Sequence, residues 1–315
     1  MRIIKESVTE VIEQDILKRI EYCGRICYKS EEQISEGSAL RFVKMLIDRK
    51  HYAMLEHAPL VLSMTKRMAK VIKNLGHGTF LNVTLNEQED RYLVSGNTRA
   101  WRELFEEKEQ YGASVETIER IEAYMQMSLG KELYSILFPN IYICDVNKNY
   151  LLTQEDVLKL PNLSKKEAKA HLYLTAHFIC DRGVSHELVR HRPASFAQES
   201  TRYCNYSKDT FGKEITFIDP EFEDTYSQSL WVEAMQYAEL TYFRLLEMGL
   251  APQQARGVLP TDVKTEVIMT CNLDEWQHVI NLRYHGTTGA PHPHMLRTMK
   301  LWYELIKSNY DKWID

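Results

Sequence analysis

The stretch from residue 172 to residue 192 constrains the fold of this chain more than any other, because a strand pattern leads there into a helix pattern. Small or apolar side chains recur at every second position over residues 172–180, which is the period of a β-strand. Asp181-Arg182-Gly183 predicts a turn, and Ser185 predicts the cap of a helix over residues 186–192. The chain is therefore expected to present the end of this helix from a rigid strand, turn and helix unit.

The end of the predicted helix carries Arg190-His191-Arg192, and seven residues separate this triplet from Ser200-Thr201-Arg202-Tyr203. Guanidinium groups bind phosphates by paired hydrogen bonds, so the two segments predict an anion site for nucleotide chemistry. Pro193 disfavours a longer helix, which would leave the arginines beside the unpaired carbonyls of the last turn, where positive charge is favourable. A solvated basic helix end and an anion site are compatible, and both remain open here.

Charge balance limits what this site can bind. The chain has 315 residues, 44% of them hydrophobic and 26% charged, which is enough for one large domain or two modest ones. Its 39 basic and 44 acidic residues give a net charge of −5. No overall positive field exists to hold a long nucleic acid, so we expect the basic site to be local and no nucleic acid polymer to be bound.

The sequence predicts a cytoplasmic protein that does not enter a membrane. Residues 1–13 lack the apolar core of a signal peptide, and no apolar run approaches the roughly 20 residues of a membrane span. No two cysteines form a CxxC pair, which favours reduced thiols over a disulfide framework. The six cysteines are Cys23, Cys27, Cys144, Cys180, Cys204 and Cys271.

The remaining pattern predicts mixed helices and strands without repeats or low-complexity linkers. Residues 65–170 read as an elaboration with a hairpin around residues 86–90 and two helices. Gly76-His77-Gly78 fits neither a dinucleotide fingerprint nor a P-loop. Helices are predicted from apolar spacing over residues 9–22 (capped by Thr9), 38–49, 114–129, 154–160, 226–250, 274–284 and 294–306, and a capping box at Ser164-Lys165-Lys166-Glu167 opens a further short helix.

Arg190-His191-Arg192, seven residues and Ser200 resemble the signature of the flavin-dependent thymidylate synthases. Glu56-His57 resembles that family's Glu-His step at the start of a strand. The resemblance covers roughly residues 1–64 and 170–306, and leaves most of the middle segment outside. Further matching positions are Ser195, Arg202, Tyr203, Ala255-Arg256, Leu259-Pro260, Asn272, His278 and Asn281-Leu282-Arg283.

The resemblance implies an α+β fold, in which a central, mostly antiparallel sheet is flanked by helices. It implies a single catalytic domain over residues 1–315, with residues 65–170 as an insertion within it. The implied assembly is a homotetramer with active sites between subunits. The implied reaction is the reductive methylation of dUMP to dTMP, with 5,10-methylenetetrahydrofolate as carbon donor, FAD as hydride carrier and NADPH as the reductant of the flavin.

The resemblance also implies roles for particular residues. Glu187 stands where many members have Gln, and Gln198 stands where Glu is common, so both contacts are expected to differ from the family pattern. Residues matching dUMP-binding positions are Glu187, Arg190, Gln198, Glu199, Ser200, Thr201, Arg202, Arg256 and Arg283. Residues matching FAD-binding positions are His57, Arg190, His191, Arg192, Gln198, Asn272 and His278.

Arg283 is the candidate catalytic residue. Uracil C5 must become nucleophilic, and a fixed cation beside the N3/O4 edge favours the ionised ring. The alternative is a helix C-terminal arginine that caps carbonyls. Ser200 lacks the surroundings of a hydrolase nucleophile, and none of the cysteines lies in the Pro-Cys-His of the thymidylate synthases that work without flavin. His292 and His294 lack a third ligand nearby, so no metal is expected.

Two other functions remain open from the sequence. The first is a nucleic-acid-binding module with Arg190, Arg192 and Arg202 on phosphates and Tyr203 and Tyr206 stacked on bases, which the net charge disfavours. The second is a flavoprotein of unrelated chemistry.

Overall fold

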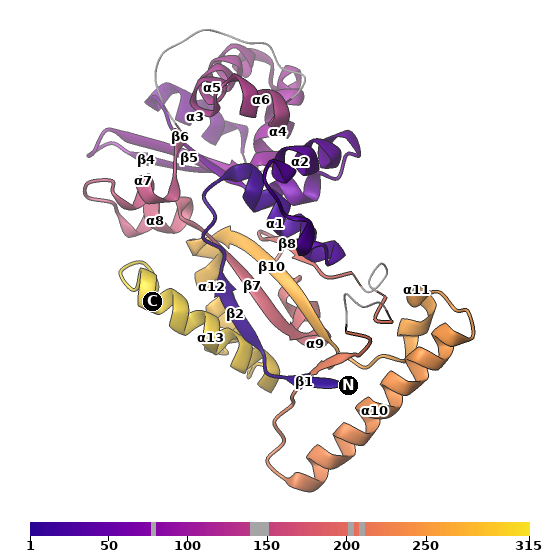
Figure 1. The fold of residues 1–315 in the computed structure, drawn as a ribbon. Helices are drawn as coiled ribbons and strands as arrows, with labels where there is room; N and C mark the ends of the chain where they lie inside the picture. Colours follow the sequence, from indigo (N-terminus) through magenta and orange to yellow (C-terminus); the bar gives the residue numbers. More distant parts are fainter. Residues whose placement is uncertain (77–79, 139–150, 201–204, 208–211) are drawn as a thin grey trace.

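A four-stranded antiparallel sheet forms the centre of the molecule (Figure 1). The computed structural model describes residues 1–76, 80–138, 151–200, 205–207 and 212–315. The strands follow the order β2 (Ser7–Glu10), β7 (Tyr173–Asp181), β10 (Lys264–Asn272) and β8 (Ser195–Gln198). Because β7 and β10 pair along their whole lengths, the end of β7 lies beside the start of β10. The predicted strand over residues 172–180 is confirmed.

A second four-stranded antiparallel sheet is built mainly from the middle segment. Its order is β4 (Asn82–Asn86), β5 (Arg91–Asn97), β3 (Pro59–Ser63) and β6 (Leu151–Leu152). β4 and β5 form the predicted hairpin. Helices near this sheet are α2 (Ser38–Asp48), α3 (Lys66–Leu75), α4 (Thr98–Glu106), α5 (Val115–Leu129) and α6 (Lys131–Leu137), with a 3-10 helix at Lys108–Ser114. That residues 65–170 are an insertion within one domain stays a prediction.

The other elements surround the central sheet. β1 (Arg2–Ile4) and β9 (Thr216–Ile218) form a small parallel pair, and α10 (Thr225–Glu247) projects away from the rest of the chain (Figure 1). The remaining helices are α1 (Ile16–Tyr28), α7 (Gln154–Leu158), α8 (Lys165–His171), α9 (Arg182–Leu188), α11 (Pro252–Ala255), α12 (Leu273–Arg283) and α13 (Pro293–Tyr310), with 3-10 helices at Glu31–Gln33, Tyr52–His57 and Arg256–Val258.

Two predicted helix starts are wrong. Residues 9–22 do not form one helix capped by Thr9, because Thr9 lies in β2 and pairs with β7, while α1 begins after Asp15. Asp15 caps α1 by accepting a hydrogen bond from the Lys18 backbone N–H at 2.9 Å. Aspartate is among the residues most favoured at the start of a helix, so Asp15 displaces the predicted cap Thr9.

The second correction concerns the helix that was predicted to carry the arginines. Asp181 caps α9 by accepting from the Val184 N–H at 2.7 Å, so the helix starts at Arg182 and ends at Leu188. Ser185 lies inside this helix, where its hydroxyl donates to the carbonyl of Arg182. Residues 190–192 therefore follow the helix and lie in the connection to β8, although β7 and α9 still fix its starting point.

Helices α12 and α13 pack against the central sheet and bury the second of two large apolar clusters. Phe178 of β7, Trp276 of α12 and Trp302 of α13 meet there, with the indole centroids 4.8 Å apart. The first cluster lies between the second sheet and α2 to α6. The α+β class with a mostly antiparallel central sheet is confirmed. Among the described residues, every helix is too short or too polar to cross a membrane.

Candidate functional site

The junction between β10 and α12 positions one side of the site. Asn272 ends β10 and caps α12, because its side-chain oxygen accepts from the Glu275 backbone N–H at 3.0 Å. Its side-chain amide donates to the carbonyl of Ala170 at 3.3 Å. The buried strand therefore fixes the start of α12, whose surface then presents Glu275, His278 and Arg283.

Arg283 lies in the last turn of α12 and is bound by α9 and by the connection after it, which contains the arginine motif. Its Nη1 donates to Oε2 of Glu187 at 2.7 Å and its Nη2 to the Glu187 carbonyl at 3.4 Å. Its Nε donates to Nε2 of His191 at 3.1 Å. One of these contacts is with a carbonyl, as the alternative of a carbonyl-capping arginine expects, and the two shorter ones are with side chains. They also give Glu187 a function, because its carboxylate pairs with Arg283, which an amide would do more weakly.

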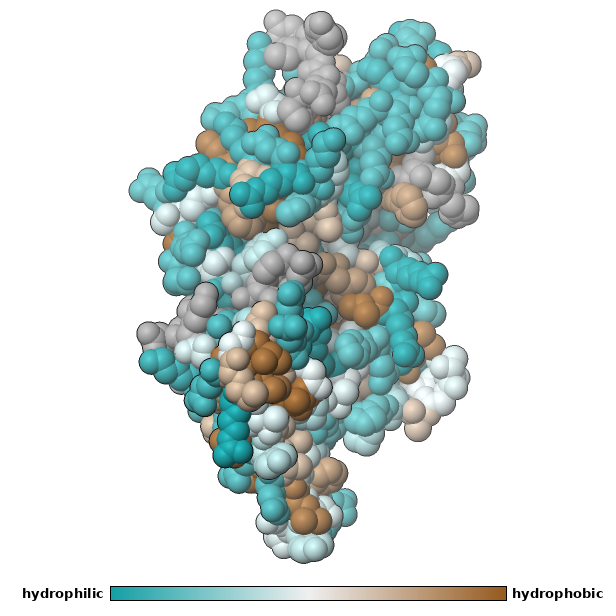
Figure 2. All heavy atoms as spheres, turned by 90° about the vertical axis from the view of Figure 1, so that its right-hand side faces the viewer, coloured by the Kyte–Doolittle hydropathy of each residue, from teal (hydrophilic) through white to brown (hydrophobic). Residues whose placement is uncertain are grey.

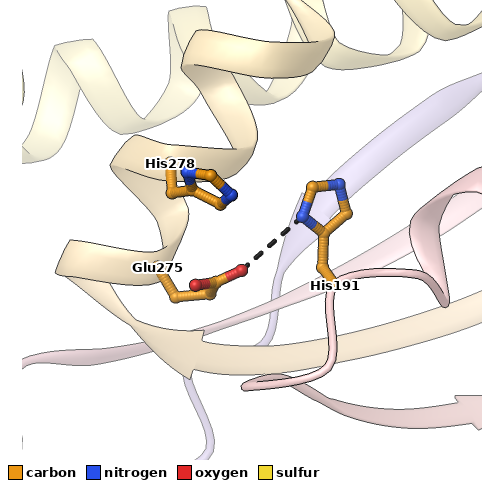
Figure 3. Close-up of side chains that lie close together, drawn as sticks. All are labelled: His191, Glu275 and His278. Carbon is orange, nitrogen blue, oxygen red and sulfur yellow. Dashed lines mark ion pairs between the residues drawn. The ribbon is translucent and has the colours of Figure 1, made fainter.

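His191 is buried and its protonation follows from this geometry. A guanidinium only donates hydrogen bonds, so Nε2 of His191 must carry a lone pair. Nδ1 of the neutral ring therefore carries the proton, and it lies 3.5 Å from Oε1 of Glu275 (Figure 3). The exposed ring of His278 stands edge-on to His191, with centroids 6.0 Å apart.

These three side chains also satisfy the distance requirement of a metal site, since the ligand atoms of His191, Glu275 and His278 lie within 4.8 Å of one another. A metal on Nδ1 of His191 would move the ring proton to Nε2, where the N–H of Arg283 already points. The arrangement therefore favours a His191 ring held between Arg283 and Glu275 without a metal, and the expectation that no metal binds stays a prediction.

A cavity of about 570 Å³ separates the arginine motif from the second sheet. Arg192, in the connection before β8, and Asn272, at the end of β10, line one side of it, and both Arg190 and Arg192 are exposed. Phe80, Arg99 and Glu103 line it from the middle segment. Sequence reasoning missed these three residues, because the signature covers only the two flanking regions and no local pattern marks them as functional.

His57 lies deep beside this cavity. Its Nδ1 hydrogen bonds with Oγ1 of Thr270 at 2.8 Å, and Thr270 lines the cavity. Burial lowers the pKa of His57 to about 4, so the ring is neutral near pH 7. Its Nε2 is buried without a hydrogen-bond partner among the described residues.

The residues around Ser200 form a separate group at the end of β8. Gln198 donates from its side chain to the Ser185 hydroxyl at 2.9 Å, and the Ser200 N–H donates to the carbonyl of Cys27 at 3.1 Å. Buried Glu199 pairs with Nζ of Lys264 at 2.9 Å beside a cavity of about 380 Å³. Thr201, Arg202 and Tyr203 lie outside the described residues.

A buried charge network that the sequence did not mark lies under this second cavity. Glu266 contacts Lys29, Lys264 and His177, and the hydroxyl of Tyr22 bonds the other His177 nitrogen at 2.8 Å. Burial alone would raise the pKa of Glu266, but the hydrogen bond with His177 and the two ammonium groups hold it well below its usual range. The carboxylate is therefore charged at neutral pH.

Arg256 is the predicted site residue that the chain places apart. It is exposed at the start of the 3-10 helix after α11, and Figure 1 shows α11 across the central strands from α12, which carries Arg283. The structure thus brings together Glu187, His191 and Arg283, with His278, Arg192 and Asn272 on the same side, and places Gln198, Glu199 and Ser200 in a second group.

Comparisons with known proteins agree with the arginine motif. Residues 157–307 match the family model described as Thymidylate synthase complementing protein. The chain is 36% identical over 106 residues to the flavin-dependent thymidylate synthase of Pyrococcus abyssi, and 38% identical over 106 residues to that of Thermococcus kodakarensis. Each alignment covers 33% of this chain and 43% or 42% of the relative, so the chain spans less than half the length of these proteins.

A third relative and one solved structure complete the comparison. The flavin-dependent thymidylate synthase of Kosmotoga olearia is 32% identical over 125 residues, which are 36% of this chain and 54% of that protein. A crystal structure of the UMP/dUMP methylase PolB from Streptomyces cacaoi aligns with 100% of this chain and 93% of its own, at a TM-score of 0.39 and 15% identity, a likeness too weak to support an argument. Except for His57, every predicted site residue lies within residues 157–307. The chain is thus similar to the thymidylate synthase complementing protein family over residues 157–307, and to flavin-dependent thymidylate synthases over 106 residues.

Proposed function

We propose that this protein is a flavin-dependent thymidylate synthase, a methyltransferase that converts dUMP to dTMP. The observation that carries the proposal is the fixed guanidinium of Arg283, held between His191 and Glu187 beside the exposed arginines of the motif. A guanidinium has five N–H groups, and the described contacts use three of them. One N–H on each Nη remains to face a ligand.

In this proposal, the two remaining N–H groups of Arg283 meet the N3/O4 edge of uracil. A fixed positive charge there stabilises the ionised ring, and the negative charge that reaches C5 makes this carbon nucleophilic. Glu187 limits how far the guanidinium rotates. The other proposed dUMP contacts are Arg190, Gln198, Glu199, Ser200, Thr201, Arg202 and Arg256.

The donors around the larger cavity fit an anionic, aromatic cofactor such as FAD. Arg192 supplies a guanidinium at the wall and Asn272 marks the amino-terminal end of α12, and both favour phosphate oxygens. The unpartnered Nε2 of His57 is a buried polar atom beside the same cavity. When bound, FAD would supply the hydride, with NADPH as its reductant and 5,10-methylenetetrahydrofolate as the carbon donor. The residues proposed to hold it are His57, Arg190, His191, Arg192, Gln198, Asn272 and His278.

We further propose a homotetramer whose active sites lie between subunits. Arg256 follows α11, Gln198 ends β8 and Arg283 ends α12, so these residues come from different elements, and in this proposal a neighbouring subunit completes the site. Helix α10 supports an assembly, because Tyr226, Tyr237 and Met248 on or beside it are 73%, 69% and 76% exposed. Figure 2, which looks onto the side where α10 lies, shows apolar residues gathered in the lower part of that face.

A cytoplasmic location is also proposed. The cysteines whose surroundings the structure describes, Cys23, Cys27, Cys180 and Cys271, are all free thiols. Free thiols are typical of a reducing compartment. The alternative of a nucleic-acid-binding module is weakened, because Tyr206, which was expected to stack on bases, is buried and its ring packs against Tyr242.

The test is release of tritium from 5-tritiated dUMP by the purified, flavin-loaded protein with methylenetetrahydrofolate and NADPH. Methylation at C5 expels this hydrogen, so we expect release that depends on all three small molecules. A folded, flavin-loaded sample that oxidises NADPH but releases no tritium would instead support a flavoprotein of other chemistry. A colourless protein with strongly salt-dependent affinity for oligonucleotides would support the nucleic-acid module.

A further inference from the structure

We propose that Glu275 is a positioning residue for Arg283 and acts on it through His191. This inference deepens the proposed function and rests on it for its kinetic consequence, whereas the structural part stands on the described contacts alone. Neither the signature nor the predicted site includes Glu275. Figure 3 shows that its carboxylate points from α12 toward the ring of His191.

The first step concerns the two ends of the His191 ring. Nε2 accepts the Nε–H of Arg283 at 3.1 Å, so it has no proton of its own. Nδ1 consequently carries the proton and lies 3.5 Å from the Glu275 carboxylate. A carboxylate near Nδ1 stabilises the tautomer that Arg283 requires.

The second step concerns what holds Glu275 itself. Its backbone N–H is bound by the Asn272 cap at 3.0 Å, in the first turn of α12. Arg283 lies in the last turn of the same helix. Both partners of His191 are therefore fixed to one rigid element, and the buried ring is clamped between them.

The third step is the consequence for the reaction. Without Glu275, the His191 ring is free to adopt the tautomer with a proton on Nε2. The Nε2–H of His191 would then point at the Nε–H of Arg283, and no hydrogen bond could form between them. Arg283 would then lose its Nε contact and keep only its contacts with Glu187. A guanidinium that is free to turn stabilises the ionised uracil less well, because a donor that must reorganise during the reaction contributes less.

Three variants test the kinetic consequence through tritium release. Glu275→Ala removes the carboxylate, and we expect kcat to fall on the order of tenfold to a hundredfold, by analogy with loss of the partner that orients a metal-bound histidine, with KM for dUMP changed less. Glu275→Gln keeps an oxygen that can accept from Nδ1–H, so it should recover much of the rate. Asp274→Ala is the matched control, because Asp274 is an exposed acid in the same first turn.

The overturning kinetic results are equally specific. Equal kcat values for Glu275→Ala and Asp274→Ala would show that Glu275 contributes only its charge at the helix terminus. A Glu275→Gln variant as slow as Glu275→Ala would show that a side-chain oxygen at position 275 facing Nδ1–H of His191 does not support the rate. Zinc-dependent activity that is lost in both Glu275 variants would replace the positioning chain with a metal site.

A second readout does not depend on turnover. Nitrogen-15 NMR of histidine-labelled protein reports which ring nitrogen carries the proton, and His191→Gln identifies the signals of that ring. We expect Nδ1–H in the wild type and in Asp274→Ala, and a shift toward Nε2–H in Glu275→Ala. An unchanged tautomer in Glu275→Ala would overturn the inference. A shifted tautomer in a protein whose wild type never methylates dUMP would refute only the proposed function.

Discussion

At the residue scale, buried histidines give the protein a defined response to acid. Burial lowers the pKa of both His57 and His171 to about 4, below the usual value near 6.5. His57 bonds Thr270, and His171 is bonded by Thr84 at one nitrogen and by Ser95 at the other. In the unfolded chain these rings would protonate at higher pH than in the folded chain, so acid favours unfolding.

We therefore predict a fall in the free energy of unfolding between pH 7 and pH 5. Since the folded pKa lies below the unfolded one, stability from each histidine is complete above about pH 6.5 and is lost as the pH falls toward 4, roughly 1–2 kcal/mol per histidine by pH 5. Urea denaturation at the two pH values measures it. His171→Asn should lose less stability over this interval than the wild type, and identical pH dependence would contradict the assignment.

Glu167 and Glu266 affect the stability of the fold at lower pH than the histidines do. Hydrogen bonds from Arg91 and Ser164 overcome the effect of burial and lower the pKa of Glu167 to about 2. The pKa of Glu266 is also lowered. A carboxyl group with a lowered pKa stabilises the fold above its unfolded value near 4.5 and loses this contribution only as the pH falls further. The histidines therefore lose their stabilising contribution between about pH 6.5 and pH 4, and these two carboxylates lose theirs only below about pH 4.5.

At the element scale, α9 determines where the arginine motif starts. Asp181 caps this helix with one carboxylate oxygen, and its other oxygen contacts Nδ1 of His294 at 2.7 Å. This contact gives His294 a structural partner at the end of β7, although the sequence assigned it no role. The motif at residues 190–192 follows the end of α9 directly.

We predict that Asp181→Ala lowers stability by about 2–3 kcal/mol, because it removes the helix cap and leaves His294 without its partner. Asp181→Asn should lose less, since its side-chain oxygen still caps the helix. Guanidinium denaturation measures both variants. Equal losses for Ala and Asn would show that the contact between the carboxylate and His294 outweighs the cap.

The starts of α1 and α9, which the sequence misplaced, show which features follow from local sequence and which depend on the pairing of distant strands. The alternating pattern of β7 identified the strand because each side chain faces one environment. Thr9 was assigned to a helix because its apolar neighbours fit a helical spacing, but pairing of β2 with β7 takes precedence. Asp181 was read as part of a turn, whereas its carboxylate caps α9.

The site was predictable to the extent that its residues follow one another in the signature. The motif led to His191, Glu187 and Arg283, which the fold brings together from α9, the connection after it and α12. Glu275, Phe80 and Arg99 were missed, because their importance depends on β10, α12 and the second sheet meeting in space. Long-range packing of this kind leaves no local pattern.

At the scale of the whole molecule, α10 is a projecting helix (Figure 1) that leaves several large apolar side chains exposed within one chain. Tyr237 is 69% exposed in the middle of this helix, and neighbouring Gln236 is also exposed. An apolar face on a projecting helix is costly in water unless another surface covers it.

We predict that Tyr237→Glu weakens the proposed homotetramer, because it places a charge in the proposed apolar contact. Sedimentation velocity should show a shift to smaller species in Tyr237→Glu, and the control Gln236→Glu should keep the wild-type assembly. Unchanged circular dichroism would exclude unfolding. Identical assembly of both variants and the wild type would place the subunit contact elsewhere.

The most direct test of the account is the formation of dTMP from dUMP by the flavin-loaded protein, with wild type and Arg283→Ala compared under the same conditions. We predict that the wild type forms dTMP in proportion to the NADPH consumed. Arg283→Ala should retain flavin but lose at least about a hundredfold in rate, as when a charge-stabilising donor is removed from an active site. A folded, flavin-loaded wild type that forms no dTMP would contradict the proposed function, and an active Arg283→Ala would contradict the role of Arg283.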